Sequence, residues 1–114
     1  MTWALTPLTE EQRAIQHTAR EFAQRELAPH VDRWDREAYF EPGVIEKLAQ
    51  LGFLGMMVPE QYDGLGLDTL TYLVALEELA AVDASTAVLM SVHNSLPTQM
   101  IQRWGWPEHK ENYL

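Results

Sequence analysis

The sequence contains no cysteine, which excludes disulfides, thiolate metal sites and cysteine nucleophiles. It is also poor in basic residues: eight Lys and Arg stand against seventeen Asp and Glu, for a formal net charge of -9. Such a chain is not expected to bind nucleic acid, anionic lipid or a phosphate-rich ligand by overall electrostatic attraction. Hydrophobic residues nevertheless make up 46% of the 114 residues, which excludes a disordered chain and fits one domain.

The sequence shows neither a signal peptide nor a run long and apolar enough to cross a membrane. Residues Met1 to Pro7 lack a basic start and lead directly into Glu10 and Glu11. The longest stretch without Asp, Glu, Lys or Arg, from Ala84 to Gln102, contains a proline and several polar side chains. We therefore expect a soluble cytoplasmic protein.

The spacing of the apolar residues predicts an all-α fold, because they recur three or four positions apart and no strand–turn–strand pattern occurs. The first helix begins at a capping box formed by Thr9 and Gln12, and Pro29 predicts a kink or a restart within it. Pro97 predicts a bend in the fourth helix. About five helices are expected in one domain, at residues 9–36, 42–51, 69–82, 85–104 and 107–114.

Capping residues mark several of the predicted helix ends. Asp68 and Ser85 are expected N-caps, and Pro42 suits the first turn of the second helix. Gly52 is expected to end that helix in the left-handed conformation. The apolar run Phe53–Val58 is too short for a helix of its own and is interpreted as buried extended chain.

The third predicted helix is apolar nearly all round, with Leu70 and Leu73 among its residues, and is expected to lie at the centre of the core. Its exceptions are Glu77 and Glu78. Adjacent helical residues diverge by about 100°, so these two carboxylates cannot act together as an acid/base pair. One is expected to face solvent and the other a partner side chain or a helix end.

No residue pattern predicts a metal or a catalytic centre. A di-iron site in a helical bundle needs a Glu three residues before a His, and a zinc site of the His-Glu-x-x-His type needs paired histidines. Neither pattern occurs, and no serine has a visible His/Asp partner. We therefore assign no metal site and no catalytic residue, and interpret all four histidines as structural or surface residues: His17, His30, His93 and His109.

Two further motifs have both a structural and a functional interpretation. Gly64–Gly66 precedes a helix like a phosphate-binding loop, but Thr69 replaces the third glycine and Asp68 places a negative charge there, so turn geometry is favoured. His93–Asn94–Ser95 interrupts an apolar helix just before a proline. It is either a buried hydrogen-bonded network at a kink or the wall of a pocket.

Several short segments occur in a fixed order along nearly the whole chain: Leu8–Gln12, Ala19–Ala23, Leu27–Pro29, Trp34–Arg36, Leu51–Gly55, Val58–Gly66, Glu77–Ala80, Ser91–Leu96, Trp104–Gly105 and Lys110–Leu114. In this order they resemble the N-terminal helical domain of the acyl-CoA dehydrogenase family. The segment Ser91–Leu96 is most similar to the short-chain members.

The resemblance implies an enzyme that binds FAD non-covalently and removes the α and β hydrogens of an acyl-CoA thioester. Its electrons pass to an electron-transferring flavoprotein, and the parent enzyme is a homo-oligomer, a tetramer or a dimer. In the family, the base and most flavin and CoA contacts come from a middle β-domain and a C-terminal helical domain, which residues 1–114 do not include. Accordingly, no bound flavin and no dehydrogenase activity are expected of this chain alone.

The resemblance also implies two sites on this chain. One is the wall of the acyl pocket, formed by residues of the fourth helix: Val88, Leu89, Val92 and His93. The other concerns Leu65 and Leu67, which are either tucked into the protein or offered to the flavoprotein. The alternative to the enzyme is a helical interaction module that shares the fold and carries out no chemistry.

Overall fold

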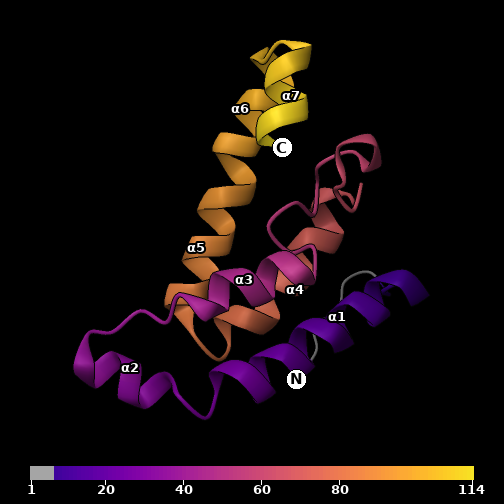
Figure 1. Ribbon diagram of the computed structural model, residues 1–114. Coiled ribbons are helices and arrows are strands. Elements are labelled where there is room, and N and C mark those ends of the chain that lie inside the picture. Colours follow the sequence, from indigo (N-terminus) through magenta and orange to yellow (C-terminus); the bar gives the residue numbers. More distant parts are fainter. Residues whose placement is uncertain (1–6) are drawn as a thin grey trace.

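The structure, a computed structural model, describes residues 7–114, and over this range it contains helices and turns but no strand. This confirms the all-α prediction. Most of the segment that argues against a signal peptide, Met1–Thr6, lies outside the described residues. Within the described range, no helix is both long and apolar enough to span a bilayer. The helices are α1 (Glu10–Phe22), α2 (Val31–Glu37), α3 (Gly43–Gln50), α4 (Thr69–Ala80), α5 (Ala84–Ser95), α6 (Pro97–Trp104) and α7 (Pro107–Tyr113) (Figure 1).

The first predicted helix divides in two at Pro29, as expected of a residue without an amide hydrogen. Its start is confirmed, because the Gln12 amide donates to Thr9 Oγ1 at 3.1 Å and the Thr9 amide donates to Gln12 Oε1 at 3.0 Å. After α1 the backbone widens into one π-helical segment, Ala23–Leu27, and helix α2 restarts after a turn.

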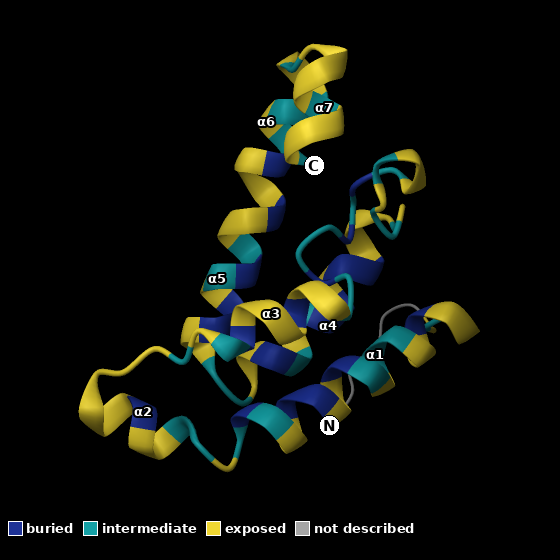
Figure 2. Cartoon of the chain, in the orientation of Figure 1, coloured by how far each residue is buried: buried dark blue, intermediate teal, exposed yellow. Residues whose placement is uncertain are grey.

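The core lies where α4 is sandwiched between α1 and α5 (Figures 1 and 2). The largest fully buried apolar side chains come from four helical segments and from the loop after α3, and α4 contributes Leu79 to them. The prediction that α4 is surrounded by the core is wrong for one face, because Leu70 is 49% exposed and Leu73 is 47% exposed. These largest fully buried apolar side chains are those of Leu27, Leu48, Phe53, Met56, Leu79 and Met90.

Three local predictions are corrected by the structure. Helix α5 is capped by Asp83 rather than Ser85, since Asp83 Oδ1 accepts the Ser85 amide at 3.2 Å. Pro42 lies at the N-cap position just before α3. The segment Phe53–Val58 is buried at three positions but is a chain of turns rather than extended backbone, because the amides of Gly55 and Val58 donate to carbonyls three residues back.

The molecule is flat, with principal extents of 42 × 37 × 19 Å. Helices α5 and α6 form a bent rod that carries α7 to one end, and the bend falls at Pro97 as predicted (Figure 1). Helix α2 lies toward the opposite end of the ribbon. This layout leaves one side of the α5–α6 rod without a neighbouring helix of residues 7–114 (Figure 2).

Candidate functional site

Asn94 connects α5 to the loop that precedes α4. Its side chain is 1% exposed. Its Oδ1 accepts the Met56 amide at 3.1 Å, and its Nδ2 donates to the carbonyl oxygens of Phe53 at 2.8 Å and Met90 at 2.9 Å. Of the two interpretations of His93–Asn94–Ser95, the satisfied buried network therefore holds for Asn94, whereas His93 and Ser95 are exposed.

The glycine-containing loop is held by its own backbone. The amides of Leu65, Gly66 and Leu67 donate to carbonyl oxygens of residues 55, 58 and 56, at 3.0, 2.9 and 2.8 Å. A Cβ atom on Gly64 would lie 2.1 Å from the carbonyl oxygen of Val58, so only glycine allows this close approach. The glycines serve turn geometry, as predicted.

This loop does not fit the pyrophosphate of the flavin that the resemblance implies. Its amides are already engaged in backbone hydrogen bonds. The first turn of α4 is occupied by the carboxylate of Asp68, whose Oδ1 accepts the Thr71 amide at 2.9 Å and its hydroxyl at 2.6 Å. These bonds lower the pKa of Asp68, so the group stays anionic where a phosphate would have to dock.

Leu65 and Leu67 are both partly buried against the core cluster. Leu65 lies directly over Gly52, whose φ is +80° as predicted for a left-handed helix end, and a Cβ there would meet Leu65 Cδ2 at 2.8 Å. Each leucine thus keeps part of its surface open on the loop. Docking of a partner at these residues stays a prediction.

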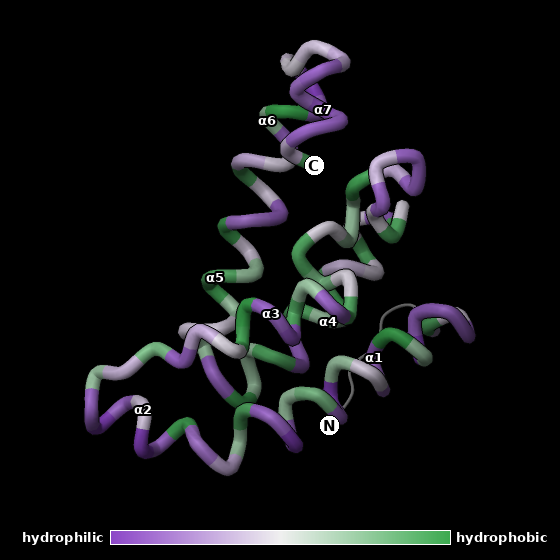
Figure 3. Tube along the Cα trace, viewed as in Figure 1, coloured by the Kyte–Doolittle hydropathy of each residue, from purple (hydrophilic) through white to green (hydrophobic). Residues whose placement is uncertain are grey.

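The four residues assigned to the acyl-pocket wall lie on α5 but not all in the same environment. Val88 is 59% exposed and Val92 is 48% exposed, and His93 is exposed beside them. Leu89 is partly buried and packs against the core. The two exposed valines begin an apolar stripe that continues at four-residue spacing through Leu96, which lies between α5 and α6, to Met100 and Trp104 of α6. Figure 3 shows apolar segments, in green, recurring along α5 and α6.

Glu77 and Glu78 point to different surroundings, as predicted for adjacent helical residues. Glu77 is exposed, whereas Glu78 accepts two hydrogen bonds from Arg20 of α1, at 3.0 Å from Nε and 2.8 Å from Nη2. The hydrogen bonds and charge of Glu78 raise the pKa of Arg20. The pair ties α1 to α4 and is a structural contact.

The described residues contain no group of three or more His, Asp or Glu side chains that could hold a metal ion. They do contain two buried polar side-chain atoms without a hydrogen-bond partner in residues 7–114, the indole nitrogen of Trp34 and the hydroxyl of Tyr72. Unpaired buried groups are uncommon in folded proteins. Sequence patterns gave no signal for either atom, because whether a buried donor finds a hydrogen-bond acceptor depends on the tertiary packing around it.

Comparison with known proteins matches residues 9–114 to the family model described as the N-terminal domain of acyl-CoA dehydrogenase. The mitochondrial short-chain specific acyl-CoA dehydrogenase of Mus musculus is 41% identical over 94% of this chain and 26% of its own length. An acyl-CoA dehydrogenase of Bacillus subtilis is 35% identical over 94% of this chain and 28% of its own. The chain thus spans about a quarter of the length of the curated relatives it matches.

Solved structures share the fold described above. Butyryl-CoA dehydrogenase from Megasphaera elsdenii superimposes with a TM-score of 0.89 and 33% identity, over 97% of this chain and 30% of that one. A chain from a structure of the electron transferring flavoprotein of Acidaminococcus fermentans gives a TM-score of 0.91 and 39% identity, over 100% of this chain and 29% of that one. With a family model that covers nearly all of its residues, the chain belongs to the acyl-CoA dehydrogenase family and corresponds to its N-terminal helical domain.

Proposed function

We propose that this chain is the acyl-pocket domain of an FAD-dependent enzyme that desaturates acyl-CoA thioesters between the α and β carbons. The observation that carries the proposal is the apolar outer face of α5, where Val88 and Val92 are half exposed in a helix free of Asp, Glu, Lys and Arg. A hydrocarbon tail is held by burial against such a surface rather than by hydrogen bonds.

The role of this chain in the reaction is binding and exclusion of water. Val88 and Val92 offer branched, stiff side chains that limit the length and width of the tail beside them. Leu89 is anchored in the core and fixes the rotation of α5 about its axis. His93, exposed one residue further, adds a polar group at this wall. The base that removes the α-proton is assigned to no residue of this chain.

A flavin bound to the parent enzyme would supply the acceptor for the β hydrogen. Its binding site is assigned to other parts of the parent enzyme, because the loop at Gly64–Gly66 and the start of α4 do not fit a pyrophosphate. The chain alone is accordingly predicted to bind no FAD and to have no dehydrogenase activity. A yellow preparation of residues 1–114 that retains flavin after gel filtration would contradict this prediction.

The acyl-pocket assignment is tested in the full-length enzyme with Val92→Phe, which adds an aromatic ring to the proposed wall. We expect kcat/KM for octanoyl-CoA to fall about tenfold relative to that for butyryl-CoA, because the longer tail loses its space. Ile45→Phe, a matched change at an exposed position of α3, should leave the ratio unchanged. An unchanged ratio in Val92→Phe would refute the assignment. Absence of activity towards every acyl-CoA in the wild type would instead favour the non-catalytic interaction module.

The loop leucines are proposed as the docking point for an electron-transferring flavoprotein. The support is the partial exposure of Leu65 and Leu67 on a loop whose backbone is fixed by three amide hydrogen bonds. Leu67→Ala in the full-length enzyme should slow reduction of the flavoprotein while leaving reduction of a small dye intact. If both rates fall equally, the leucine acts through the fold and docking is refuted.

Two further properties stay proposals. The parent enzyme is proposed to be a homo-oligomer, a tetramer or a dimer, and to act in the cytoplasm. Sedimentation of the full-length enzyme and fractionation of the source cells measure these directly.

A further inference from the structure

Gln12 is a polar side chain that is only 7% exposed, on a helix whose other buried residues, Ala19 and Phe22, are apolar. Buried polar groups need hydrogen-bond partners, and the capping box with Thr9 uses only the backbone amide and Oε1 of Gln12. The side-chain nitrogen is free for a different bond. It donates to Oγ1 of Thr71, 59 residues further along the chain, at 3.4 Å. Gln12 therefore helps to cap its own helix and reaches α4 at the same time.

The bond from Gln12 enters a second cap, at the start of α4. Thr71 is 4% exposed, and its hydroxyl donates to Oδ1 of Asp68 at 2.6 Å. This bond is the largest cause of the lowered pKa of Asp68, so the carboxylate stays ionised and can only accept. A hydroxyl has one proton, and Thr71 uses it on Asp68, so its oxygen is the acceptor toward Gln12. Gln12, Thr71 and Asp68 thus form a relay with one direction, in which each hydrogen bond strengthens the next.

The relay ends beside the loop leucines. Asp68 caps α4 and follows Leu67 directly in the chain. The Leu67 amide donates to the Met56 carbonyl at 2.8 Å, which is one attachment of the loop. The relay adds a second attachment, to α1, because a displacement of Asp68 relative to α1 would break the bond between Thr71 and Gln12. Leu67 therefore lies between a backbone bond on one side and the relay on the other.

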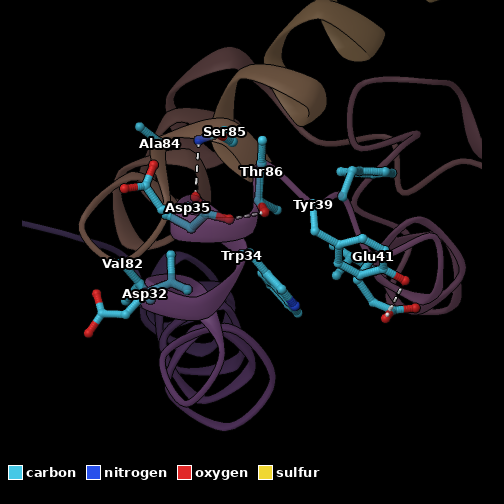
Figure 4. A pocket seen from close by; sticks show the side chains of 14 residues that line it. Asp32, Trp34, Asp35, Tyr39, Glu41, Val82, Ala84, Ser85 and Thr86 are labelled. Atoms are coloured by element: carbon cyan, nitrogen blue, oxygen red, sulfur yellow. Dashed lines mark hydrogen bonds between the residues drawn. The ribbon is translucent and has the colours of Figure 1, made fainter.

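Helix α5 begins with the same kind of cap, an Asp followed three residues later by a Thr, but without the third member. Asp83 accepts the Ser85 amide at 3.2 Å and the Thr86 hydroxyl at 2.6 Å, and Figure 4 shows both bonds. Thr86 is 2% exposed, yet no side chain among residues 7–114 donates to its Oγ1. A cap of this kind is therefore complete with its own helix, and the bond from Gln12 is additional to what the cap of α4 needs.

A second contact holds α1 on α4 away from the relay. Arg20 and Glu78 join the same two helices with bonds of 3.0 and 2.8 Å. Positions 12 and 20 lie about 12 Å apart along a helix. The relay and this ion pair therefore secure different ends of the α1–α4 contact, and the relay is at the end that carries the loop.

We propose that Gln12 is a positioning residue for the docking of the electron-transferring flavoprotein, because through the relay it sets where Leu67 stands relative to α1. This assignment rests on the docking role proposed above for Leu65 and Leu67. Gln12 is buried and acts through Thr71 and Asp68 on the docking loop, not on the acyl chemistry. Its loss should therefore raise KM for the flavoprotein and leave the reduction of a small dye unchanged.

The test measures KM for the flavoprotein and the rate of dye reduction in the full-length enzyme. Gln12→Met keeps the length of the side chain and removes its hydrogen bonds, and Thr71→Val keeps the shape of threonine and removes its hydroxyl. We expect each variant to raise KM at least about fivefold, whereas Thr71→Ser, which keeps the hydroxyl, should stay within about twofold of the wild type. Since both changes interrupt one relay, the double variant should raise KM no further than either single variant.

Three further variants separate the relay from its surroundings. Gln12→Glu keeps an acceptor for the Thr9 amide, but its ionised carboxylate cannot donate to Thr71, so KM should rise as in Gln12→Met. Arg20→Met breaks the ion pair at the other end of the α1–α4 contact. Thr86→Val removes the matching hydroxyl at the start of α5. The last two variants should keep KM within about twofold of the wild type.

Leu67→Ala is measured alongside, to distinguish failure of this assignment from failure of docking itself. If Leu67→Ala raises KM and Gln12→Met does not, docking stands and the positioning role is overturned. If Leu67→Ala does not raise KM, docking is overturned and the role of Gln12 in it is overturned as well. The assignment is also overturned if dye reduction falls in step with flavoprotein reduction in both Gln12→Met and Thr71→Val, if Arg20→Met raises KM equally, or if the effects of the double variant multiply.

Discussion

Asn94 offers the sharpest test of how this domain holds its loop. In Asn94→Ala, the Met56 amide and the Phe53 carbonyl lose their side-chain partner at buried positions. Neither group has a backbone partner outside the helices that could replace it. Leaving a buried polar group unpaired costs about 1 to 3 kcal/mol, so two such groups should lower the unfolding free energy of the variant by about 2 to 6 kcal/mol. That is a large share of the roughly 5 to 15 kcal/mol of a typical domain.

The free energy of unfolding is measured by urea denaturation followed by circular dichroism at 222 nm. Ser95→Ala is the control, because its hydroxyl is exposed and bonds only to the Ser91 carbonyl within the same helix. We expect the control to stay within about 0.5 kcal/mol of the wild type. A loss in Asn94→Ala no larger than in the control would refute the role of Asn94 in holding the loop.

Asn94→Asp adds a test in which the loss of stability depends on pH. An ionised carboxylate would face the carbonyl oxygens of Phe53 and Met90, and burial further disfavours the charge, so both effects raise the pKa in the folded state. A raised folded-state pKa means that stability is retained below the unfolded value of about 3.9 and lost as pH rises through the folded value. The variant should therefore approach the wild type near pH 3 and fall away from it toward pH 7. A pH-independent difference would contradict the hydrogen-bond assignment.

Three other measurements follow from the structure. The pKa of Asp68 is lowered by Thr71, so the stabilisation it gives is present above about pH 4 and lost below it; Asp68→Ala should lower Tm by about 3 °C at pH 7 and leave it unchanged near pH 2. Gly64→Ala should cost about 3 kcal/mol or more in urea unfolding, because its methyl group would overlap a carbonyl oxygen, whereas Gly43→Ala, with 3.4 Å to the nearest atom, should be nearly neutral. The exposed apolar stripe should drive self-association of the 114-residue chain, and Val92→Glu should reduce it; a monomeric sedimentation profile of the wild type at high concentration would count against this.

Sequence periodicity was sufficient to predict the helices, because their signals are local. The capping box at Thr9, the restart at Pro29 and the left-handed Gly52 follow from one or two residues and their backbone preferences. Asp83 was missed as the cap of α5 because Asp83 and Ser85 are both good caps, and only the backbone angles decide between them. Phe53–Val58 was predicted as extended because burial was recognised but its turn hydrogen bonds were not.

The candidate sites were less predictable, because they depend on which helix faces remain open. Periodicity marks Leu70, Leu73 and Val92 as apolar, but it cannot distinguish a face that packs on a neighbouring helix from one that packs on nothing within residues 7–114. The unpaired indole of Trp34 gives no signal in the sequence at all. Its environment is created by α2 and the α4–α5 turn, which are about fifty residues apart along the chain.

Helix α5 connects the two surfaces proposed for the parent enzyme. Its outer face presents Val88 and Val92. Its inner face holds the loop through Asn94, whose two hydrogen bonds to Met56 and Phe53 leave the loop little freedom relative to the helix. The loop in turn fixes Leu67, because the Leu67 amide donates a hydrogen bond to the carbonyl of Met56, the residue whose own amide donates to Asn94. A shift of α5 in response to a bound tail would therefore move the loop with it, because the interior is close-packed and cannot absorb the displacement. With the two surfaces coupled in this way, Asn94→Ala in the full-length enzyme should change acyl-chain preference and flavoprotein reduction together, and a change in only one of the two would contradict the coupling.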